Sequence, residues 1–450
     1  MKKALTIAGS DSSGGAGIQA DIKTFSALGL YGTSVLTVLT AQNTKTVADI
    51  LVVPEPFFKN QLLSVLDDIK PDIIKIGVLY DTTIIDIVYQ VLYPLKIPIV
   101  LDPVLISGTG IKLLKEDSYD AFKKKIIPLS FVITPNLHEA EILSENKIKD
   151  EKALVESAFN IIKYGTCNVI IKGILDPNDN SKVFDILVQK NSDTLTKLYN
   201  KRLNINETHG TGCNFSSSLA SFIGKGYNIT EAFKLANLYV KEGLYNSIRI
   251  GKGLSITNPL YKIYDNSSRY NVILSLTSSI KILEELEDFY LIIPETKTNF
   301  VYSIERPQSL NDVAGILGRI SDIGTRIKIP NVVEFGASKH VANAVISANK
   351  INNSIRSAMN IKNNEQILNV CKTNFEHSFY LREDEDIDSR NREGSTVSWG
   401  IKTAFEKENA AEIVFHQGDY GKEPMIMVFG KDPLDVINKI KLILLELKNN

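Results

Sequence analysis

The first 171 residues alternate short apolar runs with longer helical stretches, and this pattern limits the possible folds more than any other feature. The apolar runs cover residues 4–8, 34–39, 73–76, 97–101, 131–133 and 168–171, and the helical stretches cover 18–28, 57–66, 83–92, 117–126 and 151–163. Apolar strands that alternate with helices favour a mostly parallel sheet covered by helices on both faces. We therefore predict an α/β fold whose ligands bind at the carboxyl ends of the strands.

Composition limits the classes of partner. The chain has 450 residues and a net charge of −1. It is long enough for two or three domains, but it has no overall basic field to hold nucleic acid or an anionic membrane. No apolar run is long enough to span a membrane, and the first strand-like run is too short for a signal peptide. Cys167, Cys213 and Cys371 have neither metal-ligand nor disulfide spacing, which fits a reducing compartment. We expect a cytoplasmic protein that binds neither nucleic acid nor membranes.

Polar residues follow several predicted strands at the edge where a ligand would bind. They are Gln42, Asp102, Asn136, Glu139 and Lys172. Asp102 and Glu139 suit Mg²⁺, which proteins bind through few carboxylates together with substrate phosphates, and Lys172 suits a phosphate oxygen. Taken singly, each has a simpler explanation: Asp102 could cap a turn, Glu139 could be a charge in a first helical turn, and Lys172 could be solvated. Their shared position favours a site.

A further candidate is the turn at residues 208–213, in which Gly210 and Gly212 precede Cys213 and a helical stretch at 214–224. Such a turn directs free backbone N–H groups and the positive end of the helix dipole at one point. We expect it to bind a phosphate or to stabilise charge that develops on one. The same field would lower the pKa of the Cys213 thiol. The simpler alternative is that Cys213 is a small buried apolar residue.

A glycine-rich segment, residues 9–17, lies between the first strand and the first helix. It suits close approach of backbone to a ligand, but it lacks the lysine of a P-loop and the glycine spacing of a dinucleotide-binding loop. It belongs to the first of six motifs: AGSDSSGGAGIQAD (8–21), TAQNT (40–44), KIG (75–77), DPV (102–104), TPNLHEAE (134–141) and HGTGC (209–213). In this order, over about residues 1–264, they resemble the hydroxymethylpyrimidine/phosphomethylpyrimidine kinase family of thiamine biosynthesis.

This resemblance implies a ribokinase-like fold and two successive phosphoryl transfers from Mg·ATP, first to the hydroxymethyl group and then to the resulting phosphate. It makes Cys213 a general base or oxyanion-side group, assisted by Gly210, Gly212 and Lys172. The expected ATP and Mg²⁺ residues are Asp102, Asn136, Glu139, Lys172 and Thr208, and the expected substrate residues are Gly9, Asp21, Gln42, Val78 and Val104. Gln42 suits the ring, because a carboxamide matches the ring nitrogen and exocyclic amine of an aminopyrimidine.

The chain changes character near residue 265. A short polar break at 265–269 is followed by an apolar helical stretch at 272–286 and by strand-like residues at 291–304. We therefore place a first domain at 1–265, a linker with a packing helix at 266–283 and a second domain at 284–450.

The second domain carries cationic residues beside glycines, at Arg319, Lys339, His340 and Lys422. Lys339 and His340 precede a helical stretch at 341–350 whose N–H groups could bind an anion, although scattered surface charge is the alternative. Six motifs of this region resemble the archaeal-type thiamine-phosphate synthase domain: DVAGI (312–316), GRI (318–320), EFGASKHVA (334–342), AMNI (358–361), GST (394–396) and GDYGKEPM (418–425).

The second resemblance implies an α/β domain that joins pyrimidine methyl pyrophosphate to thiazole phosphate, with Arg319 and His340 as catalytic residues and Lys339 and Lys422 as substrate ligands. We expect a bifunctional enzyme of thiamine biosynthesis that uses ATP and Mg²⁺. One alternative keeps the kinase but makes the second domain a non-catalytic sensor of thiamine phosphate. Another makes the first domain a pyridoxal-type vitamin kinase. A homodimer is one option, by analogy with related kinases.

Overall fold

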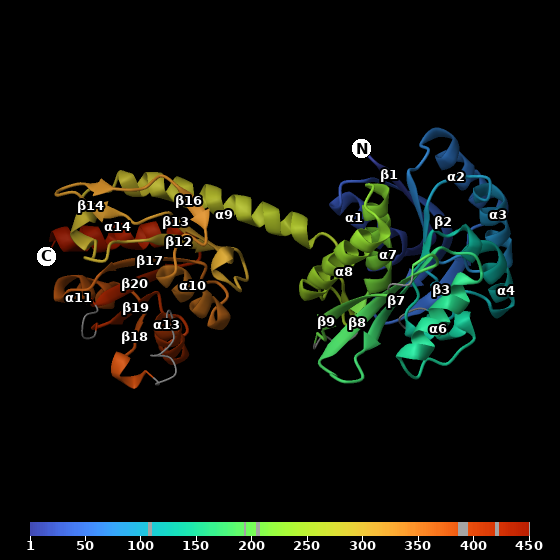
Figure 1. Ribbon diagram of the computed structural model, residues 1–450. Helices are drawn as coiled ribbons and strands as arrows, with labels where there is room; N and C mark the ends of the chain where they lie inside the picture. Colours follow the sequence, from blue (N-terminus) through green and yellow to red (C-terminus); the bar gives the residue numbers. More distant parts are fainter. Residues whose placement is uncertain (107–109, 193–194, 204–207, 386–394, 419–422, 450) are drawn as a thin grey trace. The chain divides into compact units, whose positions relative to one another are not determined.

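The computed structural model describes residues 1–106, 110–192, 195–203, 208–385, 395–418 and 423–449. The chain divides into two compact units, Met1–Ile263 and Tyr264–Asn450 (Figure 1). Each unit has its own sheet, with helices on both faces and its own apolar core. None of the described helices is long and apolar enough to cross a membrane.

The sheet of the first unit has nine strands in the order β3-β2-β1-β4-β5-β6-β7-β8-β9. Neighbouring strands from β2 to β7 are parallel, and β3, β8 and β9 are antiparallel additions at the edges. The predicted mostly parallel sheet is therefore confirmed. The strands are β1 (Lys3–Asp11), β2 (Tyr31–Gln42), β3 (Val47–Val52), β4 (Ile73–Ile76), β5 (Ile99–Leu101), β6 (Val132–Ile133), β7 (Asn168–Leu175), β8 (Lys182–Gln189) and β9 (Thr196–Lys201).

Helices cover both faces of this sheet because successive side chains of a strand point to opposite faces. Leu5 and Ile7 of β1 belong to the core on the side of α2, α3, α5 and α6. Ala4 belongs to the core on the side of α1, α7 and α8. The helices are α1 (Gly17–Ala27), α2 (Glu55–Asp68), α3 (Thr82–Leu92), α5 (Leu137–Ser144), α6 (Glu151–Ile162), α7 (Thr211–Gly224) and α8 (Ile229–Tyr245), with shorter turns η1 (Glu116–Ser118), α4 (Tyr119–Ala121), η2 (Phe122–Ile126) and η3 (Ile127–Leu129). The predicted helices on both faces are confirmed.

The second unit is also α/β, but its seven-stranded sheet is mostly antiparallel, in the order β16-β13-β12-β17-β20-β19-β18. Helices α9, α11 and α14 pack on one face, and α10 and α13 pack on the other. The elements are α9 (Tyr261–Glu284), η4 (Phe289–Ile292), β12 (Phe300–Ser303), η5 (Leu310–Asp312), β13 (Val313–Ile316), β14 (Ser321–Asp322), β15 (Ile327–Lys328), β16 (Val333–Phe335), α10 (His340–Ile351), β17 (Ser357–Lys362), α11 (Glu365–Asn374), β18 (His377–Phe379), η6 (Arg382–Asp384), α13 (Ser395–Lys407), β19 (Ile413–His416), β20 (Met425–Gly430) and α14 (Pro433–Asn449).

Two local predictions near the start of this unit are wrong. The expected polar break at 265–269 is part of the continuous helix α9, because Arg269 pairs one turn away with Asp265 (2.8 Å) and also with Asp312 (2.6 Å). Polar composition alone therefore did not mark a loop. The expected strand at 291–304 is shortened to β12, because a turn in which the Lys297 N–H donates to the Pro294 carbonyl (2.9 Å) interrupts it.

Candidate active site

The carboxyl ends of the parallel strands in the first unit surround a cavity of about 610 Å³. Its wall is formed by residues within β1, β2 and β7, by the segments that follow β1, β4, β5 and β6, and by the 208–213 turn, with further residues from β8, β9 and α8. Twelve of the residues predicted for the kinase site line it: Gly9, Gln42, Val78, Asp102, Val104, Asn136, Glu139, Lys172, Thr208, Gly210, Gly212 and Cys213. The shared strand-end position thus brought these residues together in space.

The 208–213 turn consists of β10 (Thr208–His209), which pairs with β11 (Ser255–Ile256), followed by Gly210 and the first turn of α7. Gly210 has a φ of 84°, and a Cβ atom there would lie 1.9 Å from the carbonyl oxygen of Gly15. Only glycine satisfies both conditions. A Cβ on Gly212 would lie 3.6 Å from both Asp102 Oδ2 and Lys172 Nζ. The N-terminus of α7 therefore faces this charged pair directly.

The Cys213 thiol does not have the lowered pKa that the sequence suggested. Burial raises its pKa to about 12, and the carboxylates of Asp21 and Asp102 raise it further, against the lowering effect of Lys75. The prediction was wrong because the loss of hydration and the two nearby carboxylates outweigh the helix N-terminus. At neutral pH the side chain is a neutral thiol.

Asp102 lies at the centre of the charged wall. Its Oδ1 accepts hydrogen bonds from Lys172 Nζ (3.2 Å) and Thr134 Oγ1 (3.2 Å), and its Oδ2 accepts one from Ser216 Oγ (3.1 Å). Burial alone would raise the pKa of Asp102, but Lys172 and Lys75 outweigh it and hold the pKa below its usual value. Lys172 is ion-paired and only 14% exposed, so the alternative of a solvated lysine is wrong.

Glu139 and Asn136 have a structural role as well as a place in the cavity wall. Asn136 Oδ1 accepts from the Glu139 N–H, and Glu139 Oε2 accepts from the Asn136 N–H, both at 2.9 Å. This capping box starts α5. Burial, and next the charge of Asp102, raise the pKa of Glu139 to about 7. The alternative of a first-turn helix charge therefore describes part of what Glu139 does.

Asp21 lies behind the cavity wall, although the sequence suggested that it contacts substrate. It is completely buried, is not among the lining residues, and binds Lys75 Nζ at 2.9 Å. It also accepts hydrogen bonds from Thr6 Oγ1 (2.6 Å) and Ser217 Oγ (2.5 Å). Lys75 does line the cavity, and no role was predicted for it. The available signal was a lysine within the otherwise apolar strand β4.

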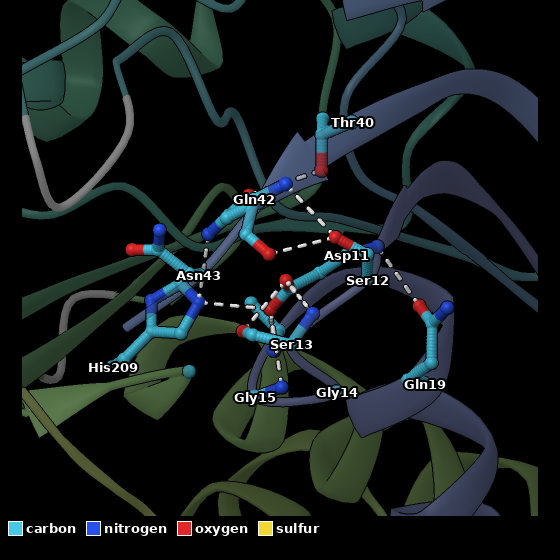
Figure 2. A network of polar contacts seen from close by, with 12 residues as sticks. Asp11, Ser12, Ser13, Gly14, Gly15, Gln19, Thr40, Gln42, Asn43 and His209 are labelled. Carbon is cyan, nitrogen blue, oxygen red and sulfur yellow. Dashed lines mark hydrogen bonds and ion pairs between the residues drawn. The ribbon is translucent and has the colours of Figure 1, made fainter. Parts of the chain in front are cut away.

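Asp11 and His209 form a second polar cluster that the sequence patterns did not reveal (Figure 2). The Asp11 carboxylate accepts hydrogen bonds from the N–H groups of Ser13 (2.8 Å), Gly15 (3.1 Å) and Ala16 (2.8 Å). His209 Nε2 lies 2.9 Å from Asp11 Oδ2 and 3.0 Å from Gln42 Nε2. Burial works against the charge, but the hydrogen bonds from His209 and Ser13 lower the pKa of Asp11 to about 2. The glycine-rich segment thus folds around its own aspartate and contacts the 208–213 turn.

The candidate residues of the second unit lie near the β13–β16 pair. Arg319 follows β13, is exposed, and donates a hydrogen bond to the Thr296 carbonyl. The Asn299 side chain donates to the Gly318 carbonyl (2.9 Å) and so supports the same loop. Lys339 and His340 are exposed at the start of α10, which follows β16. Because β13 and β16 are antiparallel, the segments that carry Arg319 and His340 leave the pair at opposite ends. The second segment then folds back over β13, since a Cβ atom on Gly315 would lie 3.2 Å from Ser338 Cβ. Lys422 lies outside the described residues.

Comparison with known proteins gives a consistent picture. Residues 11–258 match the family described as phosphomethylpyrimidine kinase, and residues 275–442 match thiamine-phosphate synthase ThiN. The chain is 31% identical over 442 residues to the bifunctional thiamine biosynthesis protein ThiDN of Methanocaldococcus jannaschii, which covers 98% of this chain and 97% of the relative.

The first unit also has single-function relatives. It is 38% identical over 257 residues to the hydroxymethylpyrimidine/phosphomethylpyrimidine kinase of Bacillus subtilis, covering 57% of this chain and 94% of that protein. Among solved structures, an ADP complex of Bacillus subtilis pyridoxal kinase matches with a TM-score of 0.52 and 32% identity, over 57% of this chain and 97% of that one.

Proposed function

The chain belongs to the family of bifunctional thiamine biosynthesis proteins that carry a phosphomethylpyrimidine kinase and a thiamine-phosphate synthase on one polypeptide, and on this premise we propose how its residues divide the reactions. The first unit transfers a phosphoryl group from ATP to hydroxymethylpyrimidine and a second one to the resulting monophosphate. The second unit joins the pyrophosphate to thiazole phosphate. One observation carries the kinase assignment: Cys213, the Asp102–Lys172 pair and Gln42 all line one cavity.

At the acceptor, we assign Cys213 to the hydroxymethyl oxygen. A thiol with a pKa of about 12 is a poor proton acceptor at neutral pH, so Cys213 orients the hydroxyl group rather than removing its proton beforehand. Phosphoryl transfer depends mainly on positioning and charge stabilisation. The backbone N–H groups of Gly212 and Cys213, in the first turn of α7, supply donors for the transferred group.

At the phosphates, we assign Lys172 to a transferred phosphate oxygen and Asp102 and Glu139 to Mg²⁺. Two adjacent buried carboxylates, one with its pKa raised to about 7, fit a divalent cation that would relieve their repulsion. Within the described part of the chain no group of three or more histidine, cysteine, aspartate or glutamate side chains could hold a metal, so the remaining ligands would come from phosphates and water. When bound, Mg²⁺ supplies charge neutralisation of those phosphates. Asn136 and Thr208 line the same wall.

At the ring, we assign Gln42 to the aminopyrimidine edge, with Gly9, Val78 and Val104 as the surrounding wall. A carboxamide offers a donor beside an acceptor, which is the complement of a ring nitrogen beside an exocyclic amine. Asp21 acts indirectly in this scheme, because it holds the ammonium of Lys75 in the wall of the cavity.

In the second unit, we assign Arg319 and His340 to the departing pyrophosphate, with Lys339 and Lys422 as further phosphate ligands. Stabilising the leaving anion lowers the barrier of a reaction in which the carbon–oxygen bond breaks early. Arginine suits this role because its guanidinium pairs with two phosphate oxygens at once.

A single time course tests both assignments. Full-length protein is incubated with hydroxymethylpyrimidine, thiazole phosphate and Mg·ATP, and all pyrimidine products are separated over time. The monophosphate, the pyrophosphate and thiamine phosphate should appear in that order. Accumulation of pyrophosphate without thiamine phosphate would contradict the synthase assignment and favour a sensor. Pyridoxal outcompeting hydroxymethylpyrimidine as acceptor would contradict the kinase assignment.

A further inference from the structure

Gln42 and His209 contact each other in the cavity wall (Figure 2). Whether one side chain donates or accepts a hydrogen bond there decides what the other must do. His209 Nε2 lies 3.0 Å from Gln42 Nε2 and 2.9 Å from Asp11 Oδ2. At the other end of the same carboxamide, Gln42 Oε1 lies 3.2 Å from Thr40 Oγ1. The state of one histidine nitrogen therefore affects both contacts of the Gln42 carboxamide.

Asp11 decides whether that nitrogen carries hydrogen. Its side chain is only 4% exposed and its pKa is about 2, so it is a carboxylate at neutral pH. A bare lone pair on His209 Nε2 would face this negative charge at 2.9 Å and be repelled. His209 Nε2 is therefore a hydrogen-bond donor, whether the ring is neutral or charged.

The amide of Gln42 must then present an acceptor to His209. The single Nε2–H of His209 is shared between Asp11 and Gln42, and a ring nitrogen that carries hydrogen has no lone pair to accept with. The carboxamide oxygen therefore suits this position, and the carboxamide NH₂ group is opposed there. Thr40 gives the same result at the other end. Its hydroxyl has one hydrogen, and Thr40 Oγ1 already lies 2.9 Å from the Ser10 carbonyl that accepts it. The lone pairs of Thr40 Oγ1 are left to accept from an NH₂ group.

We propose that His209 is a positioning residue for the pyrimidine kinase reaction, holding the Gln42 carboxamide with its oxygen toward His209 and its nitrogen toward Thr40. A half-turn of the terminal amide achieves this, since its oxygen and nitrogen occupy nearly the same space. One oxygen lone pair and one N–H then remain side by side for substrate. This edge accepts a ring with an exocyclic donor next to a ring acceptor and rejects the reversed order, a carbonyl next to a ring N–H.

The proposal rests on the proposed kinase function, and two acceptors test it. One is hydroxymethylpyrimidine, and the other is its 4-oxo analogue, in which a carbonyl replaces the amine and the adjacent ring nitrogen carries hydrogen. The kcat/KM of the first phosphorylation is measured for both acceptors with the full-length protein. Their ratio reports the orientation of the Gln42 amide, and loss of overall activity leaves that ratio unchanged.

Three variants give the proposal its sharpest test. His209→Ala should lower the amino-to-oxo preference by about tenfold or more, mainly through KM. His209→Gln should keep the preference, because its NH₂ group has one hydrogen for Asp11 and one for Gln42. Thr40→Val removes the acceptor at the other end and should lower the preference without touching His209, which keeps the test valid if His209→Ala fails to fold.

An unchanged preference in both His209→Ala and Thr40→Val would overturn the proposal. So would an equal loss of kcat with both acceptors in His209→Ala, because that result describes a purely structural residue. If the wild-type protein phosphorylates neither acceptor, the proposed kinase function fails and not merely the role of His209.

Discussion

The ammonium group of Lys75 lies 2.9 Å from a carboxylate oxygen of Asp21, and neither side chain has any exposed surface. An ion pair removed from water is stable only while both partners are present, because the desolvation of one charge is offset by the other. The pair therefore keeps the ammonium group of Lys75 charged, with the opposite charge of Asp21 directly beside it.

Lys75→Met should lower the free energy of unfolding of the first unit by about 3 kcal/mol or more, because it leaves Asp21 buried and unpaired. The measurement is urea unfolding of the full chain, with the transition of the first unit identified by its stabilisation with ADP. Lys2→Met is the matched control, since the Lys2–Asp72 pair (3.0 Å) has a lysine that is 53% exposed and should contribute about 1 kcal/mol or less. Equal effects of the two substitutions would contradict the prediction.

Cys213→Ala should slow the first phosphorylation more than the second, because the second acceptor is already an anionic phosphate. Cys213→Ser keeps a hydrogen-bond donor and should retain more of the first step than the alanine variant does. The two steps are assayed separately, with hydroxymethylpyrimidine and with its monophosphate. Equal losses in both steps would exclude a role at the hydroxymethyl oxygen.

The raised pKa of Cys213 also predicts slow alkylation. With a pKa of about 12, thiolate is scarce up to pH 10, and the rate should still be rising there. Exposed Cys167 is the internal comparison, and mass spectrometry of iodoacetamide-treated protein follows each site. A Cys213 rate that levels off near pH 7 would show that the thiol is activated after all.

Gly210→Ala should reduce kcat/KM of the kinase by about 100-fold or more, since the new Cβ would displace the 208–213 turn from Gly15 and misplace the reacting groups. Gly226→Ala is the matched control. Gly226 also has a positive φ, 97°, but nothing lies within 4 Å of the position that a new methyl group would take, so only backbone strain changes. Kinase activity of this control should stay within about twofold of the wild type.

Asp11→Asn should destabilise the first unit at pH 7 by about 2 kcal/mol, from the difference between a pKa of about 2 and the usual 3.8. The direction of the effect follows from the lowered pKa, because the charged carboxylate of Asp11 stabilises the folded state. The stabilisation is complete above pH 4 and disappears as the pH falls toward 2, where the carboxyl group is protonated in both states. The free energy of unfolding is measured at pH 7, 5 and 3 for the variant and the wild type. The difference between the two proteins should shrink only at pH 3. Asp67→Asn, on the exposed side of α2, is the control and should change little at any pH.

Arg319→Met should lower thiamine phosphate formation by about 100-fold while both kinase steps continue, so that the pyrimidine pyrophosphate accumulates. Arg306→Met is the control, because Arg306 is also exposed but lies outside the matching motifs. A similar loss in both variants would point to general electrostatic attraction of substrate and would contradict the specific role of Arg319.

Much of the kinase fold could be predicted from the sequence because its strands are short, apolar and separated by helices. The expectation that ligands bind at the carboxyl ends of parallel strands was enough to predict that Gln42, Asp102 and Lys172 lie around one cavity. Asp21, which the family resemblance made a substrate residue, instead lies on helix α1 and is buried beneath the cavity wall. Periodicity shows that a residue lies on the inner face of an element, but it does not show which neighbour meets it there.

The electrostatics could not be predicted in the same way. The thiol of Cys213 follows a helix N-terminus in sequence, which suggested a lowered pKa, but burial and two carboxylates from distant elements set the opposite direction. The Asp11–His209 contact joins residues 198 positions apart, so no local pattern reports it. In the second unit, the mostly antiparallel strands gave a much weaker sequence pattern than the parallel strands of the first unit did.

The same long-range contact affects how the enzyme is made. The glycine-rich segment leaves the ribosome before its partner at His209, which lies 198 positions after Asp11. Closing so long a loop is slow compared with forming local structure. A nascent chain that stops before the 208–213 turn therefore has most of the sheet but no finished cavity. Because synthesis continues from there into the second unit, each molecule should acquire its two activities in the order in which the substrate needs them.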